Sequence, residues 1–313
     1  MRLVFMGTPQ FAVPSLERLV ETGHEVCAVF TQPDRPKGRG QQVAFSPVKE
    51  AALRLNLAVH QPERIRRPEV VEQLKSFAVP AMVVVGYGQI IPQSIISLAP
   101  LGIINVHASL LPKYRGAAPL QWAVANGERI TGVTTMRIDA GLDTGDMLLK
   151  EATEIGERET AVELGARLSV TGADLLLRTL AGLEAGTIAP EKQNDAEATL
   201  APILKKEDGL IDWASNARYI ANRSRGFLPW PGTYTTFRGQ VLHIWRAFPV
   251  AEEPLGEPGS IRALGRRLLV RCGEESVLEI EELQLEGRKK MDAAAFLNGQ
   301  RIGENETLGE TRN

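Results

Sequence analysis

The sequence predicts a two-domain α/β protein, in which an open parallel sheet of the Rossmann-like kind precedes a smaller antiparallel β domain. A length of 313 residues corresponds to about two domains. Strand-like and helix-like segments alternate up to residue 188, which is typical of a parallel sheet covered by helices. After residue 209, short strands separated by turns predominate.

The N-terminal part opens with a strand at 2–6, a turn after Gly7, a helix at 15–21 and a second strand at 25–30. Ligands of such sheets bind beyond the carboxyl ends of the strands. A dinucleotide oxidoreductase is disfavoured, because only Gly7 is present where G-x-G-x-x-G needs three glycines. Further helices are expected at 47–55, 68–77, 92–98, 118–126 and 160–185, and further strands at 58–61, 81–85, 103–106, 131–138 and 146–154.

Periodicity is lost between residues 189 and 208, so this segment is the expected linker between domains at 1–188 and 209–313. The density of short strands in the second domain predicts a small antiparallel barrel. Its helices are expected at 216–225 and 292–297, and its strands at 233–237, 241–248, 259–263, 267–272 and 276–285.

The composition indicates a soluble, cytoplasmic protein. Apolar residues make up 43% and charged residues 24% of the chain, as in ordinary globular proteins. Cys27 and Cys272 are far apart and lack metal-ligand spacing, so reduced thiols and no metal site are expected. The first residues read as a strand rather than a signal peptide, and the longest apolar run, 79–86, is too short to cross a membrane.

Residues 102–116 are the stretch most indicative of function, because a buried strand there is expected to open into a loop that contains Pro112. Alternate residues of a strand share a face, so Asn105 and His107 are expected side by side with Val106 turned away. An amide N–H can hold an oxyanion and an imidazole can transfer a proton, which suits acyl transfer. Either residue alone would more often be a satisfied polar group at a strand end.

A second polar cluster, residues 139–146, combines three acids with two glycines around Leu142. This composition predicts a tight loop rather than the interior of a helix or strand. One carboxylate of the loop is expected to reach the imidazole of His107. Spacing alone leaves Asp139, Asp143 and Asp146 as alternatives.

Nucleic-acid binding is not indicated by the net charge of −2, so it depends on local clusters of basic residues. The loop at 34–42 is one such cluster, and residues 288–290 form another. By composition alone, each is more often a solvated surface. The basic residues concerned are Arg35, Lys37 and Arg39 in the loop, and Arg288, Lys289 and Lys290.

Together these motifs resemble the folate-dependent formyltransferases. The resemblance rests on N-x-H at 105–107, S-L-L-P-x-x-R-G at 109–116 and G-L-D-T-G-D at 141–146, and the segments 5–9 and 31–36 extend it along essentially the whole chain. It implies a monomer that transfers a formyl group from 10-formyltetrahydrofolate to the free amino group of methionyl initiator tRNA. The implied route is direct attack through a tetrahedral intermediate, without a covalent enzyme intermediate, and the implied C-terminal barrel is OB-like.

The resemblance also selects Asp143 among the three acids and implies a role for each catalytic residue. Asn105 donates to the oxyanion, His107 stabilises or protonates it, and Asp143 orients His107 and assists proton transfer. The loop at 34–42 is implied to approach the tRNA acceptor stem. The folate is implied to lie along Ser109, Leu110, Leu111 and Pro112, beside Gly86, Tyr87 and Gly88.

Two other functions remain open at this point. A formyltransferase for a small amine, such as an aminosugar nucleotide or glycinamide ribonucleotide, would share Asn105, His107 and Asp143. It would not obviously need the basic loop or the β-rich second domain. A non-catalytic RNA-binding protein is disfavoured by the complete set of catalytic residue types.

Overall fold

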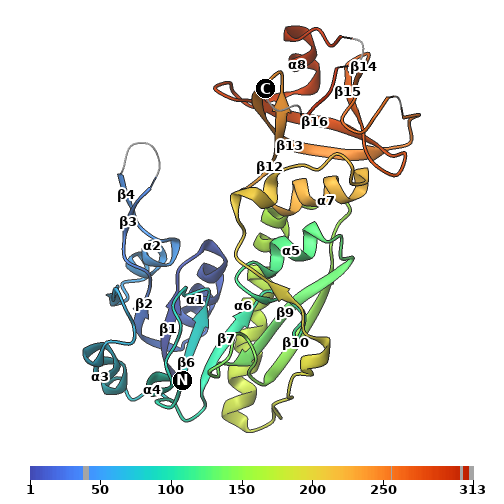
Figure 1. Ribbon diagram of the computed structural model, residues 1–313. Coiled ribbons are helices and arrows are strands. Elements are labelled where there is room, and N and C mark those ends of the chain that lie inside the picture. Colours follow the sequence, from blue (N-terminus) through green and yellow to red (C-terminus); the bar gives the residue numbers. More distant parts are fainter. Residues whose placement is uncertain (38–41, 255, 304–305, 310–313) are drawn as a thin grey trace. The chain divides into compact units, whose positions relative to one another are not determined.

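The computed structural model describes residues 1–37, 42–254, 256–303 and 306–309 (Figure 1). Contacts divide the chain into two compact units. The first comprises Met1–Pro119, Ile130–Glu154 and Gly165–Ala201, and the second comprises Leu120–Arg129, Ile155–Leu164 and the chain from Pro202 onward. Two short segments that precede residue 165 therefore belong to the second unit.

The first unit is built on a seven-stranded sheet with the strand order β10-β9-β7-β6-β1-β2-β5. The five strands from β5 to β7 in this order are parallel, as the alternation of strands and helices predicts. Strand β9 runs antiparallel to β7, and β10 antiparallel to β9, so one edge of the sheet is mixed. The strands are β1 (Arg2–Gly7), β2 (Glu25–Phe30), β5 (Val59–His60), β6 (Ala81–Val85), β7 (Ile103–His107), β9 (Ile130–Arg137) and β10 (Met147–Glu154).

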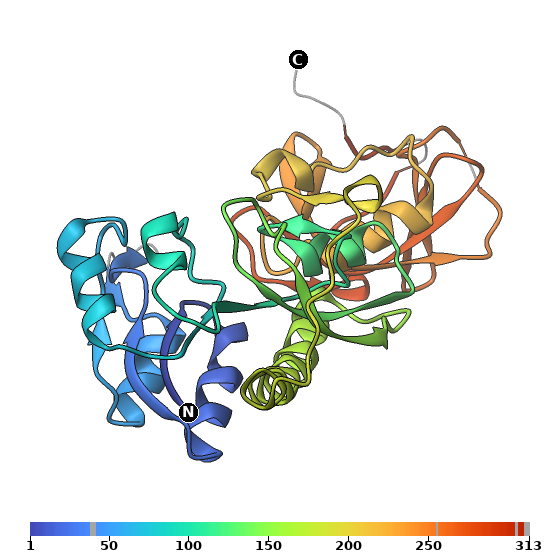
Figure 2. The ribbon, with the colours of Figure 1, turned by 90° about the horizontal axis from the view of Figure 1, so that it is seen from below.

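Helices cover both faces of this sheet. On one side, Val70 and Leu74 of α3 pack in the same buried cluster as Val4 of β1 and Met82 of β6. On the other side, α1 and α6 lie next to each other (Figure 2), and the Arg18 guanidinium of α1 binds Asp174 of α6 at 2.9 Å. The helices are α1 (Val13–Glu21), α2 (Pro47–Arg54), α3 (Pro68–Ser76), α4 (Gln93–Ile96) and α6 (Ala161–Ala185).

The loop expected at 34–42 differs in the structure, because residues 35–37 and 42–44 form two short strands. Strand β3 (Arg35–Lys37) pairs antiparallel with β4 (Gln42–Ala44), and Arg35 lies opposite Ala44. The carboxylate of Asp34 anchors the base by an ion pair with Lys49 and a 2.8 Å hydrogen bond from Gln61 Nε2. Strands of three residues are too short to produce a readable period, which explains the difference. Arg39 lies outside the described residues.

The second unit contains an antiparallel sheet with the order β12-β13-β16-β15-β14, and β17 pairs with β16. Its core includes Leu242, Ile244 and Ile280 together with Ile220 of α7 and Phe296 of α8. The predicted fold class, Rossmann-like with a barrel-like β domain, is thus confirmed. No helix in the described part of the chain is long and apolar enough to cross a membrane. The elements are β12 (Thr233–Phe237), β13 (Gln240–Val250), β14 (Ile261–Leu264), β15 (Arg267–Arg271), β16 (Val277–Leu285), β17 (Met291–Asp292), α5 (Pro119–Ala125), α7 (Ala217–Gly226) and α8 (Ala293–Gly299).

The two thiols are expected to differ in reactivity. Cys272 is fully buried, and burial raises the pKa of its thiol to about 12, whereas Cys27 is half-buried. Because the thiolate is the reactive form, a disulfide reagent at pH 8 should label one thiol in the folded protein and two after denaturation. A folded Cys27→Ala variant should stay unlabelled, and rapid labelling of that variant would contradict the buried position of Cys272.

Candidate functional site

The strand β7 supplies the two polar side chains at the centre of the site. Val106 pairs in register with Thr135 of β9, whose hydroxyl bonds to Thr179 of α6 at 2.8 Å, so this face of the strand is covered by α6. Asn105 and His107 therefore point to the opposite face, as the alternation in a strand predicts. Both are buried, at 8% and 5% exposure.

The loop between β9 and β10 brings Asp143 to these two residues. Its Oδ2 lies 3.7 Å from His107 Nδ1 and accepts a 2.9 Å hydrogen bond from the Gly116 amide. Its Oδ1 lies 3.5 Å from Asn105 Nδ2. The backbone of Asp143 is in the left-handed region, with φ of +52°, which aspartate tolerates better than most residues.

The hydrogen bonds of His107 determine where its ring protons lie. Nε2 donates to the Tyr114 carbonyl at 2.9 Å, because a carbonyl oxygen can only accept. In the neutral ring, Nδ1 therefore carries the lone pair and faces the carboxylate of Asp143. The Nδ1 lone pair and the Asp143 carboxylate thus face each other 3.7 Å apart, a separation longer than that of a direct hydrogen bond.

The carboxylate of Asp139, in the same loop, is engaged elsewhere. Both oxygens of the Asp139 carboxylate accept from Thr144 Oγ1, and one also accepts from the Gly141 amide. Asp146 directly precedes β10, and its backbone carbonyl accepts from the Arg137 amide at 2.9 Å. Among the described residues of this loop, Asp143 is the acid placed against both Asn105 and His107.

The segment after β7 presents a mixed surface. The Ser109 side chain is buried and its hydroxyl donates to the Lys113 carbonyl at 2.6 Å, and Leu111 packs with Met136 and Met147. Leu110 and Pro112 are half-buried, so they are the members of this segment with apolar surface to offer a ligand.

The Gly86-Tyr87-Gly88 turn follows β6, the parallel neighbour of β7, and so leaves the same edge of the sheet. The Tyr87 ring is 1% exposed and packs in the core. Its carbonyl accepts hydrogen bonds from Thr8 Oγ1 and Gln32 Nε2, each at 3.0 Å. A ligand at this turn would therefore meet backbone rather than the phenol ring.

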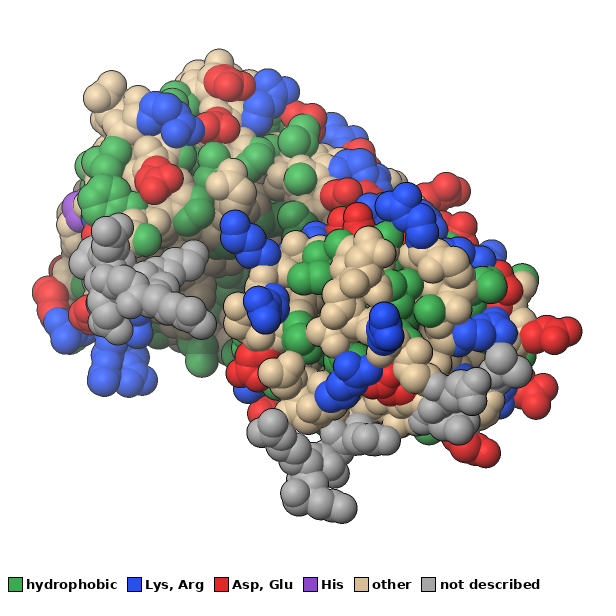
Figure 3. Space-filling model, turned by 90° about the horizontal axis from the view of Figure 1, so that it is seen from above, with side chains coloured by type: hydrophobic (Ala, Val, Ile, Leu, Met, Phe, Trp, Pro, Cys, Tyr) green, Lys and Arg blue, Asp and Glu red, His purple; other side chains and the backbone are tan. Residues whose placement is uncertain are grey.

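The predicted basic residues lie in different units. Arg35 is exposed on β3, and Lys37 ends that strand. Arg288 and Lys289 are exposed after β16, while Lys290 forms an ion pair with Glu282. On the face shown in Figure 3, Lys and Arg side chains are interspersed with Asp and Glu side chains.

Three contributors to the site were missed by sequence reasoning. The Tyr114 carbonyl and the Gly116 amide belong to the backbone, so no residue type signals them. Gln193 donates to the carbonyls of Asp143 and Gly145, although it lies in the segment expected to be a linker. Its distance in sequence from the loop leaves no pattern that could have revealed the contact.

The glycine of the R-G pair is required by a close approach of two strands. Strand β8 (Arg115–Gly116) pairs with β11 (Leu200–Ala201), and a Cβ on Gly116 would lie 2.6 Å from the Ala201 carbonyl oxygen. Any side chain here would push β8 and β11 apart and shift the Gly116 amide that binds Asp143. The glycine of the R-G pair is thus explained by the lack of space for a side chain at residue 116.

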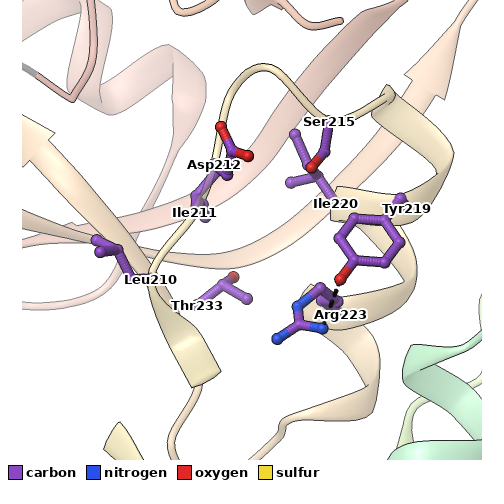
Figure 4. Close-up of a pocket in the computed structure, with 8 residues that line it drawn as sticks. All are labelled: Leu210, Ile211, Asp212, Ser215, Tyr219, Ile220, Arg223 and Thr233. Carbon is purple, nitrogen blue, oxygen red and sulfur yellow. Dashed lines mark hydrogen bonds between the residues drawn. The ribbon is translucent and has the colours of Figure 1, made fainter. Parts of the chain in front are cut away.

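A cavity of about 200 Å³ lies within the second unit (Figure 4). Arg223 Nη1 donates to the Tyr219 hydroxyl at 2.7 Å at its wall. None of the catalytic residues predicted from the sequence lines it. The lining residues are Leu210, Ile211, Asp212, Ser215, Tyr219, Ile220, Arg223 and Thr233.

Comparisons with known proteins identify the family of the chain. Residues 1–180 match the formyl transferase model, and residues 203–301 match the model of the formyl transferase C-terminal domain. The chain is 68% identical over 310 residues to a methionyl-tRNA formyltransferase of Solibacter usitatus and 59% identical over 310 residues to one of Koribacter versatilis, each alignment covering 99% of both chains.

A solved structure shares the fold. The N-formyltransferase from Helicobacter canadensis, in complex with folinic acid and dTDP-3-aminofucose, superposes with a TM-score of 0.66 at 18% identity, covering 89% of this chain and 98% of that one. Because a family model spans more than half of the sequence and the relatives align over nearly all of it, the chain belongs to the formyl transferase family.

Proposed function

We propose that this protein transfers a formyl group from 10-formyltetrahydrofolate to the free amino group of methionyl initiator tRNA, giving formylmethionyl-tRNA for translation initiation. The observation that carries the proposal is the convergence of Asn105, His107 and Asp143 on one face of β7. The full-length likeness to methionyl-tRNA formyltransferases supports the choice of tRNA as acceptor.

Asn105 would stabilise the oxyanion that forms when the amine attacks the formyl carbonyl. Its amide nitrogen carries two hydrogens, and the 3.5 Å contact with Asp143 engages one of them weakly. The other is free to donate to an oxyanion in a buried site, where such a bond is stronger than in water.

His107 and Asp143 would handle the proton of the attacking amine. An α-amino group has a reference pKa of about 7.7–8.0, so much of it is protonated near neutrality. Nδ1 of His107 and the Asp143 carboxylate together can accept a proton and hold it between them. The Tyr114 carbonyl holds the His107 ring in place, and the Gly116 amide holds the Asp143 carboxylate.

The donor supplies the formyl carbon, and the chain offers it a surface of suitable chemistry. Leu110 and Pro112 provide apolar contact for a flat ring, and the exposed glycines of the turn at Gly86-Tyr87-Gly88 provide backbone that a ligand can approach. Ser109 and Leu111 would contribute by shaping the loop, because their side chains are buried in the unit itself.

For tRNA, we propose contacts from Arg35, Lys37, Arg39, Arg288, Lys289 and Lys290. Lys290 lines a cavity of about 190 Å³ with Arg158, Arg225 and Arg246. Glu163 and Glu282 also line it, and three of the four basic side chains form ion pairs with carboxylates. We further propose a catalytic domain at 1–188, a linker at 189–208, a tRNA-binding domain at 209–313, and a monomer in the cytoplasm.

The test is formyl transfer from labelled 10-formyltetrahydrofolate to methionyl initiator tRNA, to an aminosugar nucleotide and to glycinamide ribonucleotide in parallel. Asn105→Ala should lose about 2.7–4 kcal/mol of transition-state stabilisation, or roughly 10²–10³ in kcat, since one oxyanion donor is removed. Circular dichroism and thermal unfolding would establish that the variant is folded. Transfer by a folded wild type to a small amine but not to tRNA would replace the proposal with the small-amine function.

A further inference from the structure

We propose that Gln193 is a positioning residue that holds the loop of Asp143 in its active arrangement. The expected effect on kcat rests on the proposed function, whereas the effect on the order of the loop can be measured without any assay of activity. Gln193 lies outside every motif that carries the family resemblance, 50 residues from Asp143 in the sequence.

The side-chain amide of Gln193 clamps the backbone of the loop. Nε2 donates to the Asp143 carbonyl and to the Gly145 carbonyl, both at 2.8 Å. Both hydrogens of the amide are thereby used on carbonyls that flank Thr144. This fixes the orientation of the Asp143–Thr144 and Gly145–Asp146 peptide groups, which follow the residue whose carboxylate must face His107.

The oxygen of the same amide connects the clamp to the other side of the site. Oε1 accepts from Arg115 Nε at 3.0 Å, and Arg115 precedes Gly116, whose amide binds the Asp143 carboxylate. The contacts close a ring from the Asp143 carbonyl through Gln193, Arg115 and Gly116 to the Asp143 carboxylate. The backbone and the side chain of Asp143 are thus both held by one connected set of contacts, made by Gln193, Arg115 and Gly116.

Arg115 and the chain segment that carries Gln193 are themselves held by further contacts. Arg115 is 7% exposed, and its Nη2 also binds Asp195 at 2.7 Å. Before Gln193, Glu191 and Met147 exchange two backbone hydrogen bonds of 2.8 Å. After it, the Thr199 carbonyl accepts from the Arg115 amide at 2.9 Å. Gln193 therefore projects from a segment held at both ends.

The backbone conformation of Asp143 explains why the loop needs the two hydrogen bonds from Gln193. Asp143 has φ of +52°, a conformation that costs free energy for a residue with a side chain and persists when surrounding contacts determine it. Without the two donors, the loop is expected to relax and the carboxylate to move from His107. Misplacement of a catalytic group by about 1 Å can cost 10²-fold in rate.

The decisive variant is Gln193→Glu. It has nearly the same shape and still accepts from Arg115, but it offers no N–H to the carbonyls of Asp143 and Gly145 and faces them with negative charge. We expect kcat to fall about 10²-fold while KM for the donor and for tRNA stays largely unchanged. Gln193→Asn, uncharged but one methylene too short, should shift kcat in the same direction.

The matched control is Gln73→Glu, because Gln73 is half-buried and bonds to His60 Nδ1 at 3.1 Å in the same unit without touching the site. Its kcat should remain that of the wild type. Amide hydrogen exchange of residues 139–147 should accelerate in both Gln193 variants and not in the control, whether or not the wild type formylates tRNA.

Unchanged kcat and unchanged exchange in a folded Gln193→Glu variant would overturn the inference. A raised KM with normal kcat would also overturn it, because Gln193 would then be a substrate contact. If the wild type transfers no formyl group but exchange accelerates in the variants, the clamp stands and the proposed reaction fails. If Gln193→Glu does not fold, the same readouts on Gln193→Asn decide.

Discussion

Replacing Asp143 with asparagine is expected to lower kcat for formyl transfer by about 10⁴-fold while the protein stays folded. The carboxylate faces His107 Nδ1 at 3.7 Å, and the Tyr114 carbonyl holds the proton of the ring on Nε2. An asparagine amide at this place carries no charge, so it can neither stabilise a protonated imidazole nor accept the proton. Steady-state kinetics with methionyl initiator tRNA measure the loss.

Asparagine is a cleaner probe here than alanine. It matches the shape of aspartate and, like aspartate, tolerates the left-handed conformation at φ of +52°, whereas alanine would be strained. The control is Asp174→Asn, which removes a charge paired with Arg18 on the surface of α1 and α6. A folded Asp143→Asn enzyme with nearly normal kcat would remove Asp143 from the chemistry.

The second large effect is expected for His107→Gln, with a fall in kcat of about 10³-fold, within the range for loss of an acid–base group. The glutamine amide can still donate to the Tyr114 carbonyl, so the local hydrogen bond is preserved. It cannot gain or lose a proton near neutrality. The comparison of histidine with glutamine at residue 107 therefore separates the effect of proton transfer from that of packing.

His60→Gln is the matched control for this variant. His60 lies in the same unit, stacks on Phe30 with ring centroids 4.9 Å apart, and has no contact with the site. Its replacement should affect thermal stability more than kcat. Equal losses of kcat in the two variants would show that a general disturbance of the unit, rather than the chemistry of His107, explains the result.

Most elements of the fold are predictable from local pattern. The helix expected at 160–185 is observed as α6, Ala161–Ala185, and the strand expected at 81–85 is observed as β6. These segments are long or strongly apolar, so their periodicity is legible. The hairpin of β3 and β4 was missed, because three-residue strands are stabilised by pairing with each other and not by a pattern of their own.

Which strands pair with each other is harder to predict than where the strands lie in the sequence. The parallel direction of β1, β2, β5, β6 and β7 follows from the alternation with helices, but the reversal at β9 does not. It depends on how the chain returns to the sheet after α5, which lies in the other unit. Contacts between segments distant in sequence carry no local signature.

What the sequence by itself determined is the side-by-side placement of Asn105 and His107, because the two-residue period of a strand is a property of the backbone. It also determined that an acidic, glycine-rich loop would be tight. Tertiary structure alone decided how the site is completed. The Asp143 carboxylate is held by a backbone amide from β8, and its loop is held by a glutamine from a segment without periodicity. Backbone donors have no residue type, and a side-chain contact across 50 residues exists only once the chain has folded.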